Sequence, residues 1–268
     1  MNGKNFARTL LGLLALSLTA YRSPLVALQI QDNSFLVEEA YNQERGVVQH
    51  ISTFSRPSGE GSWAYNFTQE WPLGGIRHQL SYTLPIQHDD LGTGLGDVGL
   101  NYRHQLLGNP DAPVVFAPRL SLLLPTGDHD QGRGAGALGF QTNLPLSLVV
   151  APQVVTHLNA GATITPSAKS FLGEATTTSF NLGASAIWLL RPSFNLMVEA
   201  LWLSEASVAG AGETVRDEFL LFNPGVRAAF DVGTLQIVPG LAYTFDLSSD
   251  SDEDALFLYL SFEHPFKR

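Results

Sequence analysis

The stretch I-R-H-Q-L-S-Y-T-L-P-I, residues 76–86, decides the fold. Its even positions, such as Leu80, Tyr82 and Leu84, are mostly apolar, whereas its odd positions, such as Gln79 and Ser81, are mostly polar. Successive side chains of a β-strand point to opposite faces. This period of two therefore predicts a strand with one apolar and one polar face.

The same alternation returns along the chain, in segments of 9–14 residues. Strands of soluble proteins have about 5–6 residues, whereas tilted membrane strands need about 9–11. The segment lengths therefore favour strands that cross a membrane. We expect twelve of them, at residues 46–54, 62–71, 76–86, 95–107, 113–126, 137–150, 153–165, 177–190, 193–204, 217–230, 234–246 and 255–264.

Short and long connections alternate between these segments. Residues 72–75, 151–152 and 191–192 form short turns, whereas 127–136, 166–176 and 205–216 form longer polar loops. This pattern is typical of an up-and-down antiparallel barrel with short periplasmic turns. Closing the sheet into a barrel also pairs the backbone N–H and C=O groups of its edge strands. This is required inside a membrane, because the hydrocarbon offers these groups no hydrogen-bond partner. We predict an all-β transmembrane β-barrel over residues 46–268, with the apolar parity toward lipid and the polar parity toward the lumen.

The amino-acid composition limits the kinds of molecule that the protein can be expected to bind. The 268 residues are 44% hydrophobic, carry a net charge of −10 and include no cysteine. An acid excess argues against nucleic-acid binding, which needs a basic surface, and a chain without cysteine has no thiolate metal site. We expect outer-membrane lipids and lipopolysaccharide as surroundings. The alternating end of the chain at Phe266 resembles the signal that barrel-assembly machinery reads.

The N-terminus has the features of an export signal. Lys4 and Arg8 precede an apolar core at residues 10–20, which is too short to span a bilayer as a helix. We expect a signal peptide at residues 1–27 and a bacterial outer-membrane location. Residues 28–45 then form a periplasmic lid or a lumen plug, either as a short helix that Gly46 ends or as a strand-like leader.

The polar parity supplies the candidate lumen residues. Pairing Trp71 with Ile76 across the turn would place Glu70 opposite Arg77. Asp97 and Arg119 would form a second pair on neighbouring strands. These charges either filter solutes or hold a narrow barrel in register. The candidates are Glu70, Arg77, Asp97, Asn101, Arg103, Arg119, Gln141, Asn143, His157, Asn159, Asn181, Glu199 and Arg227.

Catalytic chemistry finds little support in the sequence. His157 shares the lumen parity with Ser147, but no G-x-S-x-G nucleophile motif is present. The acidic loops at 128–130 and 250–254 lack the spacing of a calcium loop, so solvated loops explain them better. We expect no enzyme activity, no catalytic residue, no metal and no cofactor.

Two motifs carry a family resemblance. Residues 96–103 read G-D-V-G-L-N-Y-R, and residues 118–128 read P-R-L-S-L-L-L-P-T-G-D. The chain resembles the outer-membrane β-barrel family labelled MetA-pathway of phenol degradation, whose members are transporter-like. The resemblance implies a role near the uptake of aromatic compounds.

These observations predict a passive channel or transporter for small, perhaps aromatic, solutes. A non-conducting structural or adhesion barrel is the alternative from another class, and a membrane-embedded hydrolase is the third.

Overall fold

The computed structural model describes residues 30, 34–59, 61–109, 111–248 and 254–266. The predicted signal peptide and most of the acidic loop at 250–254 lie outside these residues. Sixteen strands and one short 3₁₀ helix are described. They are β1 (Val47–Pro57), β2 (Trp63–Pro72), β3 (His78–Asp89), β4 (Gly92–Leu95), β5 (Val98–His104), β6 (Val114–Phe116), β7 (Arg119–Leu124), η2 (His129–Gln131), β8 (Gly139–Asn143), β9 (Leu146–Ala151), β10 (Val154–Ser170), β11 (Gly173–Arg191), β12 (Phe194–Gly210), β13 (Glu213–Ala228), β14 (Phe230–Val232), β15 (Leu235–Asp246) and β16 (Ala255–Pro265).

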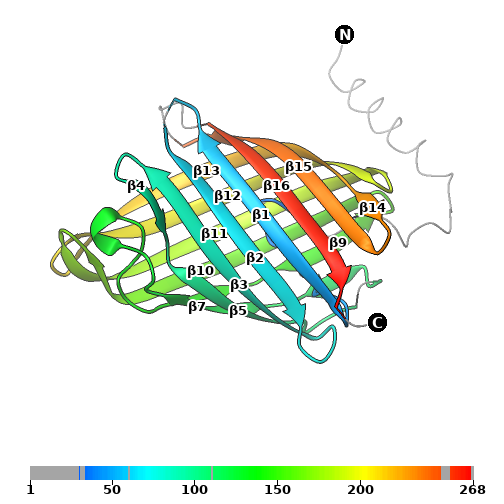
Figure 1. Ribbon diagram of the computed structural model, residues 1–268, viewed down its shortest axis with the longest axis horizontal. Helices are drawn as coiled ribbons and strands as arrows, with labels where there is room; N and C mark the ends of the chain where they lie inside the picture. Colours follow the sequence, from blue (N-terminus) through cyan, green and yellow to red (C-terminus); the bar gives the residue numbers. More distant parts are fainter. Residues whose placement is uncertain (1–29, 31–33, 60, 110, 249–253, 267–268) are drawn as a thin grey trace, which may run out of the picture.

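These strands form one closed antiparallel barrel with twelve spans (Figure 1). β1 pairs with both β2 and β16, and β10 pairs with β8, β9 and β11, so the sheet closes on itself. Pro118 and Pro145, which cannot donate to a ladder, lie where two spans break into β6–β7 and β8–β9. β13 and β14 share a third span, and β4 pairs with the end of β3 and shares a fourth span with β5. The predicted twelve-stranded barrel is confirmed.

The apolar and polar faces of the strands point as predicted, the apolar face outward to lipid and the polar face inward to the lumen. Leu120 and Leu182 on the outer face are 61% and 54% exposed, whereas Glu199 and Arg227 on the inner face are each 1% exposed. A continuous apolar outer face is the surface that acyl chains require. No helix within the described ranges is long and apolar enough to cross a membrane.

Two predicted outer loops are strands instead. β10 continues to Ser170 and β11 begins at Gly173, while β12 reaches Gly210 and β13 begins at Glu213. These strands have 16–19 residues, more than the roughly 9–11 that cross a membrane. They therefore extend beyond the barrel at the end opposite the short turns (Figure 1). The expectation of loops was wrong because only small apolar residues, Ala168, Ala175 and Val208, pack on the inner face of these extensions, and the polar and glycine residues around them obscure the alternation.

Candidate functional site

A non-strand segment fills part of the lumen. We define the lumen segment as residues 34–46, which lead into β1. The backbone N–H groups of Phe35, Leu36 and Val37 each donate to the Glu199 carboxylate, at 3.0, 3.0 and 3.1 Å. Asn223 donates to the other carboxylate oxygen at 2.8 Å. A buried carboxylate on the barrel wall thus holds three successive peptide groups.

Other wall side chains bond to the segment in the same way. The N–H of Glu38 donates to Asn159 Oδ1 at 2.7 Å, and Asn159 Nδ2 returns a bond to the Glu38 carbonyl at 2.6 Å. Farther along, the N–H of Ala40 donates to Ser147 and that of Gln43 donates to Gln79. Because the backbone donors point sideways to the wall, they are not available for helix bonds. The predicted short helix is therefore wrong, and residues 34–46 follow an irregular path with bends at residues 35–37 and 40.

The path of the segment is an inverted U. Ile30 contacts Asn195 and Arg227, near the short-turn end of the barrel. The chain reaches Glu38 at mid-height and returns to Gln79 near the short-turn end of β3. Glu38 therefore lies at the apex, which faces the outer half of the lumen.

The apex carries the main cluster of charges. The Glu38 carboxylate lies 2.9 Å from Arg119 Nε and 3.3 Å from Arg103 Nη1. Arg103 also lies 3.5 Å from Glu70 and 3.7 Å from Glu39. Two arginines on the wall are thus paired with one wall carboxylate and two from the lumen segment. Buried charges of this kind are tolerated only when paired.

Glu38 belongs to the lumen segment and not to a membrane-spanning strand. Burial by itself raises the pKa of Glu38 because it disfavours the charged form. The Arg119 and Arg103 guanidiniums, with a hydrogen bond from Asn143, outweigh that effect and hold the pKa below its ordinary value. Glu38 is therefore an anion at neutral pH, bound to two cations.

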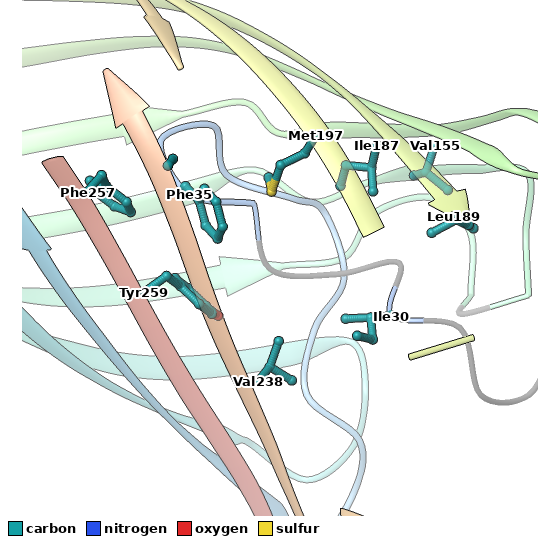
Figure 2. Close-up of a cluster of buried hydrophobic side chains, with 10 residues drawn as sticks. Ile30, Phe35, Val155, Ile187, Leu189, Met197, Val238, Phe257 and Tyr259 are labelled. Atoms are coloured by element: carbon teal, nitrogen blue, oxygen red, sulfur yellow. The ribbon is translucent and has the colours of Figure 1, made fainter. Parts of the chain in front are cut away.

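One side of the lumen, formed by β10, β11, β12, β15 and β16, is apolar. Phe35 packs between Phe257 and Tyr259, with ring centroids 5.6 and 5.2 Å apart, and Figure 2 shows it in the middle of the cluster. A Cβ added to Gly225 or Gly240 would lie 2.7 or 2.5 Å from the Phe35 ring. Only glycine at these positions lets the ring approach the wall this closely. The expectation of a polar lumen therefore fails on this side, where Ile30, Phe35, Val155, Ile187, Leu189, Met197, Val238, Ala242, Phe257 and Tyr259 form a core.

Above the apex lies a pocket of about 320 Å³. Leu36 and Glu38 contribute to its lining from the segment, and Arg119 does so from the wall. It is amphipathic, with leucines beside amide and hydroxyl groups. The remaining lining residues are Gln141, Asn143, Asn159, Thr163, Ser179, Phe180, Asn181, Leu201, Leu203 and Glu205.

An outer loop at residues 125–138 is fixed by the two sequence motifs. Asp97 accepts bonds from the N–H groups of Gly127 and Ala135, at 3.0 and 2.7 Å. Thr126 accepts from the N–H of Val98 and donates to the Gly96 carbonyl. The G-D and T-G-D motifs therefore bind each other, and this contact gives them a structural role.

The structure corrects two predicted pairs. Trp71 pairs with Leu80, so Glu70 faces Ser81, and Arg77 is exposed in a wider turn. Positive φ angles at Gly74 and Gly75 allow that turn. The cation near Glu70 is Arg103 instead. Asp97 and Arg119 are also not paired with each other, because Asp97 binds the outer loop and Arg119 binds Glu38.

The other predicted residues lie on the inner face. Asn101 accepts a bond from Arg119 at 3.0 Å, and Gln141 donates to Thr163 at 3.0 Å. Arg227 donates to the Ile30 carbonyl at 3.0 Å. Asn181 is only partly buried and lines the pocket. Most of the predicted set therefore meets either the lumen segment or the pocket.

Ser147 and His157 do lie together, with Oγ and Nδ1 2.7 Å apart. Both are fully buried, and the Ser147 hydroxyl accepts the Ala40 N–H. This hydroxyl holds the lumen segment, and the pair lies below it, away from the pocket. The arrangement gives the hydrolase hypothesis no accessible nucleophile.

Sequence reasoning missed the residues of the lumen segment that make these contacts. Phe35, Glu38 and Glu39 stand in a stretch predicted as a lid or plug without individual roles. The inward glycines Gly225 and Gly240 were also missed. In the sequence they are only small residues at inward-facing strand positions. Their role can be recognised only when the position of the Phe35 ring is known.

Comparisons with known proteins identify the fold. The chain aligns with the COG4313 outer membrane channel from Pseudomonas putida F1 at a TM-score of 0.57 and 13% identity, over 84% of this chain and 97% of that one. It aligns with the NanC porin at 0.53 and 6% identity, over 82% and 100%, and with the KdgM porin at 0.51 and 7% identity, over 82% and 99%. No family model matches the chain, and no curated protein matches it.

The chain thus has the fold of outer-membrane β-barrel channels, as its strand lengths and apolar outer face require. This agrees with the outer-membrane location expected from the sequence.

Proposed function

We propose that the protein is a passive, non-enzymatic channel for small solutes in the outer membrane, closed at rest by its lumen segment. The observation that carries the proposal is the bonding of Glu199, Asn159 and Ser147 to backbone N–H groups of a segment outside the wall. A purely structural barrel has no need to bond its inner face to a separate segment. Release of the segment would expose those polar groups to solutes.

The side chains that line the pocket indicate the class of solute that it would bind. Leu201 and Leu203 stand beside the amides of Gln141 and Asn181, which suits a molecule with one polar edge and one apolar face. The aromatic compounds that the MetA-pathway resemblance implies fit this description. We propose that a path past Arg103, Arg119 and Arg227 leads such solutes to the periplasm.

Single-channel recording in planar bilayers tests the proposal with Glu199→Gln. The amide has no charge and presents an NH2 donor in place of the oxygen that accepts from Asn223, so the segment loses about 1–3 kcal/mol of anchoring. Openings should become about tenfold more frequent than in the wild type, since 1.4 kcal/mol is a factor of ten. Glu218→Gln, at an exposed position of β13, removes the same charge and should leave the openings unchanged.

The alternative is a closed structural barrel. It would be supported if neither the wild type nor Glu199→Gln shows conductance steps or solute flux into liposomes, while both retain the heat-dependent gel mobility of a folded barrel.

A further inference from the structure

We infer that Glu38 occupies a carboxylate-binding site of the barrel wall, which takes a small organic monoanion when the lumen segment is displaced. The inference rests on the proposed function, because it names the solute class of that same lumen. In the resting state, the Glu38 side chain of the same polypeptide occupies this site.

The wall side of this site consists of three donors from three strands. Arg119 on β7 places Nε 2.9 Å from the Glu38 carboxylate, and Arg103 on β5 places Nη1 at 3.3 Å. Asn143 on β8 donates to it at 2.6 Å. Two guanidiniums and an amide are a donor set that suits a carboxylate. All three belong to the wall and stay in place when Glu38 leaves.

Second-layer contacts preorganise these donors. Arg119 Nη1 donates to Asn101 at 3.0 Å and to Ser121 at 2.6 Å, and Arg119 Nη2 has no partner among the described residues. Arg103 is held by Glu70 at 3.5 Å. The site therefore keeps its geometry without Glu38, and Arg119 retains a donor for a second oxygen.

The adjoining pocket indicates what the rest of the solute looks like. It lies directly above Glu38, and Leu201 and Leu203 of the wall give it an apolar side that remains when the segment leaves. Its volume of about 320 Å³ lies at the lower end for small-molecule sites. Glu70 offsets part of the positive charge and Glu205 also lines the pocket, so a dianion meets repulsion. A monocarboxylate with a body the size of one aromatic ring fits best.

Tethering makes Glu38 a competitor of that solute. A group held next to its site acts at an effective concentration of the order of millimolar. A free carboxylate must therefore displace Glu38 before it binds, and removal of the Glu38 charge should strengthen binding. A purely structural ion pair predicts no such gain.

Equilibrium dialysis of radiolabelled benzoate against the full chain in detergent tests the inference. Glu38→Gln should bind benzoate at least tenfold more tightly than the wild type. Adding Arg119→Gln should remove that gain. Glu44→Gln is the matched control, since Glu44 is an exposed carboxylate of the same segment that lies outside both the charge cluster and the pocket, and it should change the affinity less than twofold. Benzyl alcohol, a neutral molecule of similar shape, should show no dependence on Glu38.

Equal benzoate affinity in the wild type and Glu38→Gln, or equal gains for benzoate and benzyl alcohol, would overturn the inference. If Glu38→Gln does not fold, Arg119→Gln alone must weaken benzoate binding at millimolar concentration, and unchanged binding would refute the site. Because dialysis measures binding and not flux, a barrel that binds benzoate but never conducts would contradict only the proposed function. Conductance without the Glu38-dependent gain would contradict only the inference.

Discussion

Single residues fix the lumen segment because the wall presents side-chain acceptors where a sheet would present carbonyls. Glu199 and Asn159 each accept backbone N–H groups in an interior that excludes most water. An unpaired buried donor costs about 1–3 kcal/mol, so these side chains determine whether the lumen segment is stable there. The position of Glu38 follows from them.

Low pH should weaken the ion pairs that bind Glu38, at the apex of the lumen segment, to the wall. The pKa of Glu38 lies below its ordinary value of 4.5. The charge therefore stabilises the closed state above that pH, and the contribution is lost as pH falls through the lowered pKa. We expect openings to stay rare from pH 7 down to 4.5 and to increase only as the pH falls further.

Single-channel recording of the wild type and Glu38→Gln over this pH range tests whether Glu38 causes the acid response. Glu39 and Glu70 also face Arg103, so the variant isolates the part of the acid response that depends on Glu38. The Glu38→Gln profile should lack most of the acid step. Identical profiles in the two proteins would assign the step to other carboxylates.

At the scale of elements, β13 and β15 are shaped to receive the segment. Gly225 on β13 and Gly240 on β15 leave space for the Phe35 ring, and β16 supplies Phe257 and Tyr259. Glycine in a strand weakens it unless a close approach requires it. Here the close approach is that of the lumen segment.

A single methyl group should disturb this contact. In Gly240→Ala the new Cβ would lie 2.5 Å from Phe35 Cζ, an overpacking that costs about 1–3 kcal/mol. We expect openings to become about five- to a hundredfold more frequent in planar bilayers. Gly99→Ala is the matched control, because its Cβ would meet nothing closer than 3.6 Å. A Gly240→Ala channel as quiet as the control would show that Phe35 does not anchor the closed state.

For the whole molecule, the sequence was sufficient for the barrel and insufficient for its interior. Alternation is a local signal, so all twelve spans were predictable from runs such as residues 76–86. The Glu70–Arg77 pairing failed because the turn length, set by Gly74 and Gly75, shifts the register. The contacts of Phe35 and Glu38 join residues 65–224 positions apart, and no local pattern encodes them.

The central claim is that residues 34–46 must leave the lumen before solutes pass. The native chain has no cysteine, and a Cβ on Gly183 would lie 3.0 Å from Val37 Cγ2. Val37→Cys combined with Gly183→Cys therefore suits a disulfide between segment and wall. Single-channel recording of this variant is the most direct test, with the disulfide verified by mass spectrometry. We predict a silent channel when it is oxidised and openings after reduction. Equal conductance in both states would contradict the account.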